Sequence, residues 1–242
     1  MGRVILSGIV PTLKAPVTGV LASSLAVGST VKLMEGGTAV EYLVVNQGIP
    51  GNSNLYDASC DGTWLLRKDC HSNRVWNTRD VNTYANSAIN TWLNGDFFNS
   101  LGSVEQAFVK QVKVPYCLGN KRSTVRSGTN GLSVKAFLLG VYEVGWTTSI
   151  RSNMPIDGAN CSFFHEGYEI DSDRIAYLNG TAVTWYLRSP NTTFNTNAWS
   201  VTGNSGGPNL AAVSNDFGIR PALILPSNAL FGETTMILKG VK

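Results

Sequence analysis

Short runs of β-branched and aromatic residues, separated by Gly, Pro, Asn and Ser, recur along the chain and predict strands. The runs at 30–34 and 40–45 flank Gly36-Gly37, a turn signal that predicts a hairpin. Pro221 lies inside the predicted strand at 219–225 and has no N–H to donate to a ladder, so we expect an edge strand or a bulge there. Further strands are expected at residues 63–67, 134–139, 185–188, 198–201 and 219–225.

The period of an amphipathic helix is clearest over residues 84–93, where apolar residues fall at i, i+4, i+5, i+8 and i+9. Asp80 or Asn82 can cap the start of this helix, and Gly95 suits its end. A second helix is predicted from residue 103, because a Ser there is followed three residues later by Gln, as in a capping box.

Polar, Gly-rich stretches at 118–133 and most of 146–182 are expected to be loops. Together with the predicted elements, they indicate an α+β fold with two early helices, short mixed strands and long C-terminal loops. Residues 1–28 contain many small residues and no sustained period, which predicts an N-terminal arm that docks on a neighbouring protein or a sister chain. A single domain is expected over residues 29–242.

Composition narrows the class of protein. Hydrophobic residues make up 43% and charged residues 14%, a balance that excludes a disordered chain. The net charge of +3 is too weak for a nucleic-acid binder, and the cluster Lys121-Arg122 with Arg126 is interpreted as a solvated loop. The apolar run near the N-terminus is too short for a signal sequence or a membrane span, so we expect synthesis in the cytoplasm and no membrane insertion.

Metal and cofactor chemistry is not expected. The four cysteines form no CxxC pair, and no His lies at zinc-ligand spacing from a Cys pair. A bridge between Cys60 and Cys70 is possible, although reduced thiols are favoured in a protein assembled in the cytoplasm. Asp171, Asp173 and Asp216 could in principle bind Ca²⁺, but they follow no EF-hand spacing and are interpreted as solvated loop residues.

Two segments in the last third carry a family resemblance. Residues 185–190 read WYLRSP, residues 218–223 read GIRPAL, and Trp199-Ser200-Val201 lies between them. Together with earlier segments such as 89–94 and 137–139, this order resembles C-type-lectin-like domains of gut Firmicutes and their bacteriophages over roughly residues 29–227. The leading segment 28–51 is similar to phage tail or virion components. The resemblance implies a C-type-lectin-like fold and a place in the virion.

The same resemblance implies a function. We expect a non-enzymatic structural protein of a bacteriophage virion, assembled in the host cytoplasm and acting as a tail-associated receptor-binding or host-adhesion module with variable loops. Its expected partners are other virion proteins through residues 1–28, two further copies in a homotrimer, and a host surface glycan or protein. A capsid decoration or a purely structural virion role is the alternative.

Lectin-like tail proteins carry their ligand surface before the last strands, which corresponds to residues 191–217 here. Asn and aromatic side chains in such loops combine adaptable hydrogen bonding with rigid contact area. The triplets of Ca²⁺-dependent sugar binding are missing, and the last cysteine is Cys161, too early for the late cysteine pair of the related formylglycine-generating enzymes. The candidate ligand-binding residues are Asn191, Phe194, Asn195, Asn197, Trp199, Asn204, Asn209 and Asn215.

A remote alternative is a trypsin-like serine protease. Residues 203–208 read GNSGGP and match the nucleophile loop of that family, with Ser205 as the nucleophile and His71 preceding it. Asp80, Asp96 and Asp157 are the candidate acids. The motif lies in a Gly-rich and Asn-rich loop, where such a match arises easily by composition.

Large residues in the strand patterns are interpreted as core. Trp199 is ambiguous between core and ligand surface. Arg188 and Arg220 are expected to pair with buried carbonyl groups, or with Asp216 or Glu143, and so to fix the loops. The tryptophans expected in the core are Trp64, Trp92, Trp146 and Trp185.

Overall fold

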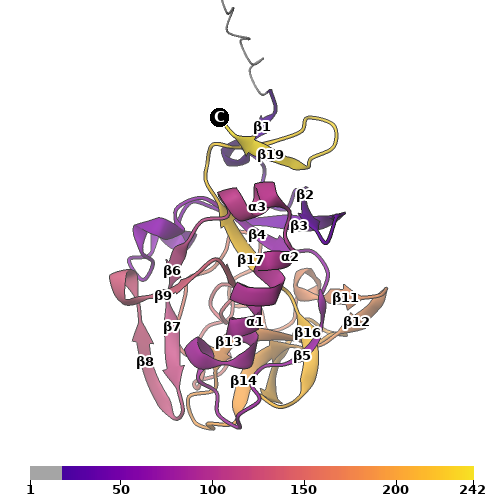
Figure 1. Ribbon diagram of the computed structural model, residues 1–242. Helices are drawn as coiled ribbons and strands as arrows, with labels where there is room; N and C mark the ends of the chain where they lie inside the picture. The colour runs from indigo at the N-terminus through magenta and orange to yellow at the C-terminus, as the bar shows by residue number, and fades with distance from the viewer. Residues whose placement is uncertain (1–17) are drawn as a thin grey trace, which may run out of the picture.

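The computed structural model describes residues 18–242, and two five-stranded sheets form its body (Figure 1). The first sheet is antiparallel throughout, in the order β10-β17-β4-β3-β2. The second has the order β15-β14-β13-β16-β5 and contains one parallel pair, β13 with β16. The strands of the first sheet are β2 (Thr30–Glu35), β3 (Thr38–Gln47), β4 (Thr63–Arg67), β10 (Ala136–Phe137) and β17 (Ala222–Leu225). Those of the second are β5 (Ser72–Val75), β13 (Trp185–Pro190), β14 (Asn197–Val201), β15 (Pro208–Ala212) and β16 (Asp216–Ile219).

Four small sheets complete the fold. One joins β1 (Val20–Leu21), β18 (Ala229–Phe231) and β19 (Leu238–Val241) at the end of the molecule where the C-terminus lies (Figure 1). The other three are antiparallel pairs that project at the edges. They are β6 (Val112–Val114) with β9 (Leu132–Val134), β7 (Tyr116–Gly119) with β8 (Arg122–Arg126), and β11 (Ala176–Leu178) with β12 (Thr181–Val183).

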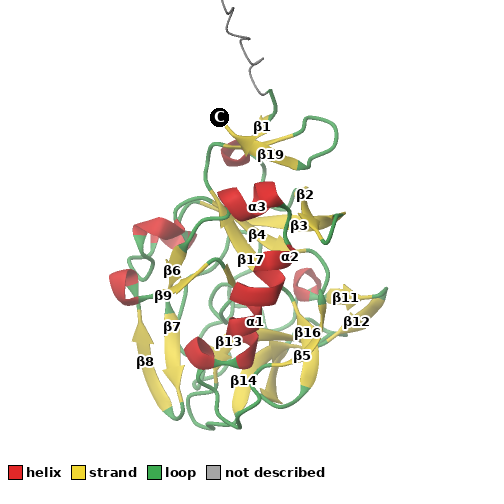
Figure 2. Ribbon diagram, viewed as in Figure 1, coloured by secondary structure: helices red, strands yellow, loops and turns green. Residues whose placement is uncertain are grey.

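The protein is mainly β, with 37% of the described residues in strands and 16% in helices, so the expected α+β fold with two early helices is wrong (Figure 2). Within residues 18–242 there is one substantial helical segment, composed of α1 (Ala88–Trp92), a wider turn over Leu93–Phe97, and α2 (Phe98–Ser100). The second predicted helix shrinks to the six residues of α3 (Ser103–Phe108). Several of the expected loops contain strands, because exposed strands such as β8 lack the apolar alternation that signals a half-buried strand.

The predicted helix caps also differ from the observed ones. Ser87 begins α1, and its hydroxyl accepts the N–H of Asn90 at 3.2 Å. Gly95 does not end the helix but lies inside it. Gly102 precedes α3 without a side-chain cap, so the capping box at residue 103 does not form.

The β2–β3 hairpin is confirmed, and both glycines of its turn have positive φ. The strand expected over 134–139 is instead divided between β9 and β10. The reason is Asn94, whose side-chain oxygen accepts the N–H groups of Lys135 and Ala136 at 2.8 and 3.2 Å. These two N–H groups therefore bond to the helical segment, and the strand is interrupted between β9 and β10.

The strand expected over 219–225 divides at Arg220-Pro221, where the chain crosses from the second sheet into the first. The paired segment β4–β5 crosses between the sheets at the same place, because β4 pairs with β17 and β5 pairs with β16. Pro221 has no N–H for a ladder. Arg220 Nε donates to the carbonyl oxygen of Arg67 at 2.8 Å instead. The four strands therefore form one antiparallel ribbon that bends at Pro221 and is shared by both sheets, and β17 is an inner strand.

Residues 1–17 of the expected arm lie outside the described residues. From residue 18 onward the chain packs on the domain. β1 pairs with β18, and Ala22 and Leu25 are buried. Within residues 18–242, no helix is long and apolar enough to span a membrane.

The core contains every tryptophan that the sequence assigned to it, and Trp199 is buried as well. The indole N–H of Trp64 donates to Cys60 O at 3.0 Å, and that of Trp185 donates to Arg174 O at 2.8 Å. The four cysteines are buried and unbridged. Burial raises the pKa of the Cys60 thiol to about 12, which disfavours its reactive thiolate form.

At the centre of the molecule, Arg188 of β13 forms an ion pair with Glu143, and neither side chain is exposed. Arg188 Nη1 lies 2.5 Å from Glu143 Oε2, and Nη2 lies 2.7 Å from Oε1. The remaining guanidinium N–H groups donate to three carbonyl oxygens, those of Pro115, Leu138 and Asp157, at 2.6 to 3.0 Å. All five donors of the guanidinium therefore have acceptors.

The carboxylate of Glu143 is equally well satisfied. It also accepts the hydroxyl of Tyr56 at 2.8 Å and the N–H of Gly140 at 2.9 Å. Burial alone would lower the pKa of Arg188, but the charge and hydrogen bonds of Glu143 raise it. This is the pairing that the sequence suggested for Arg188, and Arg220 likewise uses a backbone carbonyl, which is partly buried.

We expect Glu143→Gln to lower the free energy of unfolding by about 3–5 kcal/mol, because it leaves a charged guanidinium buried without its counter-ion. Urea unfolding followed by tryptophan fluorescence measures this. The control is Glu169→Gln, whose partner Arg151 is half exposed and whose loss should change stability by less than about 1 kcal/mol. Equal effects of the two substitutions would contradict the central role of the buried pair.

Asp157 makes the free energy of unfolding depend on pH. Burial raises the pKa of its carboxyl from 3.8 to about 6, against the opposing effects of Arg188 and Ser189. The unfolded chain releases this proton near its ordinary pKa of 3.8, whereas the folded protein holds it until about pH 6. The unfolding free energy therefore falls as pH rises through this interval.

Asp157→Asn removes this contribution. The unfolding free energy of the parent minus that of the variant should fall by about 3 kcal/mol between roughly pH 3 and pH 7. Urea titrations of both proteins across this range measure the difference, and a constant difference would contradict the assignment.

Candidate functional site

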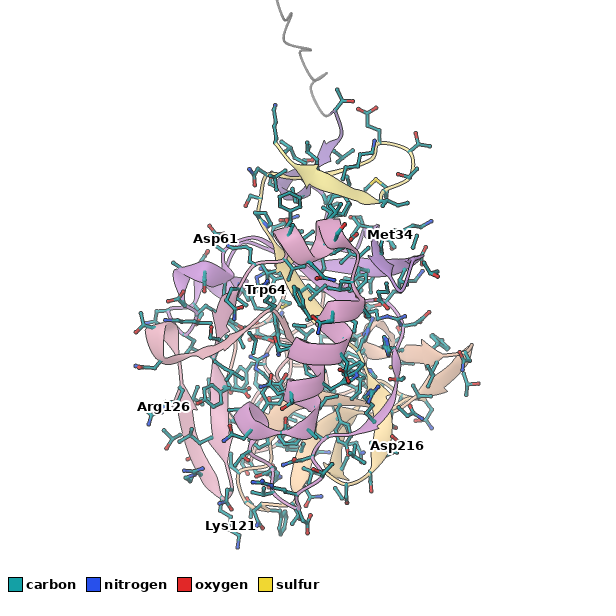
Figure 3. The ribbon with its side chains drawn as sticks, in the orientation of Figure 1. Met34, Asp61, Trp64, Lys121, Arg126 and Asp216 are labelled. Carbon is teal, nitrogen blue, oxygen red and sulfur yellow. The ribbon has the colours of Figure 1, made fainter. Side chains whose placement is uncertain are left out.

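The end of the molecule opposite β1, β18 and β19 is built from loops. The turn between β7 and β8 lies there, with Lys121 at its tip (Figure 3). The loop 191–197, which connects β13 to β14, lies against this turn through the residue that both contact, Asn82. We call the turn 119–122 and the loop 191–197 the distal loops.

Asn82 is fully buried and joins the distal loops. Its backbone N–H donates to Asn195 O at 2.7 Å. Its side-chain NH₂ lies 2.9, 2.9 and 2.6 Å from the carbonyl oxygens of Asn191, Phe194 and Asn197. Its side-chain oxygen accepts the N–H of Asn120 at 2.7 Å, so one side chain fixes both distal loops.

The loop 191–197 is also closed on itself. The side-chain oxygen of Asn191 accepts the N–H groups of Thr193 and Phe194 at 2.8 and 2.7 Å, a local turn typical of Asn. The N–H of Asn191 donates to Asn197 O at 2.9 Å. On this closed loop Phe194 remains 55% exposed. A rigid loop therefore presents an aromatic side chain to solvent.

The eight residues predicted to bind a ligand do not form one surface. Asn191 and Trp199 are buried, and they support the fold instead of facing outward. Asn204 lies in the turn between β14 and β15, and Asn209 bonds to Ser200 on the neighbouring strand. The remaining residues gather at the distal loops or the nearby start of β16; they are Phe194, Asn195, Asn197 and Asn215.

The length of the β14–β15 hairpin separates Asn204 from the candidate residues at the distal loops. Asn197 pairs with Ala212 at one end, and the turn that holds Asn204 closes the other end beyond Val201 and Pro208. Four residues of extended strand span about 13 Å. Residue type did not predict which of these side chains are exposed, because residues 198–201 of β14 are all buried.

The residues of the protease motif are not brought together. Ser205 Oγ accepts the N–H of Gly207 at 3.3 Å, within its own turn. The ring of His71 contacts Trp92 and Phe97, and its Nδ1 lies 3.0 Å from Ser72 Oγ. The strand after His71 is three strand positions from β14, about 14 Å at 4.8 Å per strand.

One candidate acid of the protease motif, Asp157, is bound to a different serine. Asp157 is buried against Ser189, whose hydroxyl donates to it at 2.8 Å. A different cluster forms from His165, Asp171 and Asp173, whose ligand atoms lie within 4.8 Å of one another. Arg174 Nη1 is 3.9 Å from Asp171, and this positive charge opposes a bound cation. Asp216 is not part of that cluster.

Sequence reasoning missed Asn82 and Asn120 as organisers of the site. Asn82 was considered only as a helix cap, and its acceptors are more than 100 residues away in sequence. Asn120 and Lys121 both have positive φ, at 52° and 60°. The Gly119-Asn120 pair between two short runs was the available signal for this hairpin turn, because Asn and Gly tolerate that conformation.

Comparison with known families supplies one match. The model of DUF6273, a domain of unknown function, matches residues 61–227, more than half of the chain. The chain belongs to DUF6273. Comparisons with curated proteins and with solved structures gave no match. The DUF6273 match begins just before β4 and ends just after β17, so it includes Asn82, the distal loops and the Arg188–Glu143 pair.

We expect Asn82→Ala to lower the free energy of unfolding by about 2–3 kcal/mol, because buried carbonyl groups lose their donor. Amide hydrogen exchange of residues 119–121 and 191–197 should accelerate more than exchange in β4. The control is Asn204→Ala, an exposed change that should stay within about 0.5 kcal/mol. Unchanged exchange in the distal loops would show that Asn82 does not fix them.

Proposed function

We propose that this DUF6273 protein is a non-enzymatic component of a bacteriophage virion that binds the host surface through its distal loops. The observation that carries the proposal is Phe194, a large aromatic side chain that is 55% exposed on a loop closed by Asn191 and fixed by Asn82. A rigid aromatic residue offers contact area with little loss of side-chain entropy on binding.

The chemistry around Phe194 suits a carbohydrate. Asn195 and Asn197 are partly exposed beside it, and Asn215 is exposed at the turn before β16. Amide groups donate and accept hydrogen bonds, as sugar hydroxyl groups require, while an aromatic face packs on the apolar face of a sugar ring. A host surface glycan is therefore the ligand we propose, with a host surface protein as the alternative outcome.

The position of the distal loops supports this role. Residue 18 and the C-terminus lie at the opposite end of the molecule, around β1 and β19 (Figure 1). A chain held to a particle at that end directs Phe194 outward. We propose attachment to other virion proteins through residues 1–28 and assembly as a homotrimer. The resemblance to phage proteins also supports the virion setting, and a purely structural virion role is the competing proposal.

We expect Phe194→Ala to reduce binding of the labelled protein to isolated cell walls of gut Firmicutes by about tenfold, because it removes most of the exposed aromatic contact. Fluorescence sedimentation with the cell walls measures this. Stability should change by less than about 0.5 kcal/mol, since the side chain is exposed.

The matched control is Tyr177→Ala, which removes a 46% exposed aromatic side chain from β11, away from the distal loops. Its binding should equal that of the parent. If the two substitutions have the same effect on binding, or if the parent binds none of the cell walls, the adhesion proposal fails and the structural role replaces it.

A further inference from the structure

A second concave surface lies between β5, the edge strand of the second sheet, and the helical segment that begins near Asn86. It consists of two adjoining hollows of about 650 and 380 Å³, which share Arg74, Thr78, Ala88 and Trp92. Both volumes fall in the usual range of small-ligand sites. We call this surface the β5–α1 groove; Asp216, labelled in Figure 3, lines one side of it.

Two arginines of the groove have no counter-ion. Within residues 18–242, neither Arg74 nor Arg79 forms an ion pair, and neither side chain makes a hydrogen bond with another residue. Unpaired arginines that line a hollow are suited to bind a carboxylate or phosphate, since a guanidinium matches the geometry of either anion.

Arg74 is also held in place before any ligand binds. Its Cζ lies 4.0 Å from the centroid of the Trp92 ring. Trp92 is only 9% exposed, and the rings of His71 and Phe97 pack against it at 5.1 and 5.5 Å. A guanidinium fixed on a buried ring loses little entropy when it binds an anion.

The rest of the lining suits hydroxyl groups. Asp96 and Asp216 are exposed carboxylates that accept hydrogen bonds, and Asn73 and Asn86 are exposed amides. The two carboxylates would repel a polyphosphate backbone, which disfavours a nucleic acid. The apolar residues Val75, Ala88 and Ile89 also line the groove.

We propose that the β5–α1 groove binds an acidic saccharide, in which Arg74 and Arg79 hold a carboxylate or phosphate group and the amides and carboxylates hold the sugar hydroxyls. No residue of the distal loops lines the groove, so it would be a second ligand site whose existence does not depend on Phe194.

The test is calorimetric titration of the full chain with three probes: trigalacturonic acid, glucose 6-phosphate and the neutral maltotriose. At least one acidic probe should bind about tenfold more tightly than maltotriose, and its affinity should fall with added salt. Comparison of the two acidic probes identifies the carboxylate or the phosphate as the preferred anion. Failure of both to bind, or equal binding of maltotriose, overturns the proposal.

Variants locate the site. Arg79→Gln should lower the affinity for the acidic probe by about tenfold, because a charge-assisted hydrogen bond is lost. Arg126→Gln removes the same charge from an exposed position on β8 and should leave affinity unchanged. Equal weakening by both would indicate a general charge effect and overturn the site. Tetraglutamate binding as tightly as the acidic sugar would overturn the saccharide assignment and indicate an acidic peptide. The Phe194→Ala variant should bind the acidic probe with the affinity of the parent. The groove and the adhesion proposal are therefore tested independently.

Discussion

The ion pair between Arg188 and Glu143 is the interaction on which the arrangement of the loops depends. Segments that are far apart in sequence supply all its acceptors, so one guanidinium fixes their mutual positions. A pair of buried charges without water is stabilising only when every donor and acceptor is satisfied, and both residues meet that condition here. The irregular stretch between β10 and β11 therefore has a defined path although it contains little regular structure.

Local sequence patterns predicted the parts of the fold whose structure depends on residues close together in sequence. The β2–β3 hairpin was predicted from two β-rich runs on either side of the turn signal Gly36-Gly37. The helix content was overestimated, since the pattern from Ser103 supports only six helical residues. Strands such as β8 were missed because their side chains are exposed and show no alternation. The division at residues 134–139 depends on the side chain of Asn94, about 40 residues away, which no local pattern reveals.

The candidate site shows the same division. The sequence predicted that Arg188 needs a buried acceptor, because an arginine within an apolar strand must be satisfied, and Glu143 was among the candidates. It also predicted exposed Asn and aromatic residues in the last third. It could not distinguish Phe194, which is exposed, from Trp199, which is buried, because the side that each residue faces depends on strand pairing. Asn82 was beyond reach, since all its side-chain acceptors lie on a loop that only the folded chain brings near.

The bent ribbon shared by both sheets has a consequence for biosynthesis. Its two halves, β4–β5 and β16–β17, are joined by contacts such as Arg220 to Arg67, which are 153 residues apart. Neither sheet can be completed until β16 and β17 have left the ribosome, so the strands made earlier keep unpaired edges until then. Long-range pairing of this kind folds slowly and exposes apolar surface during synthesis. Production of the protein should therefore depend on chaperones that protect nascent chains, and the two sheets should form together as one cooperative unit.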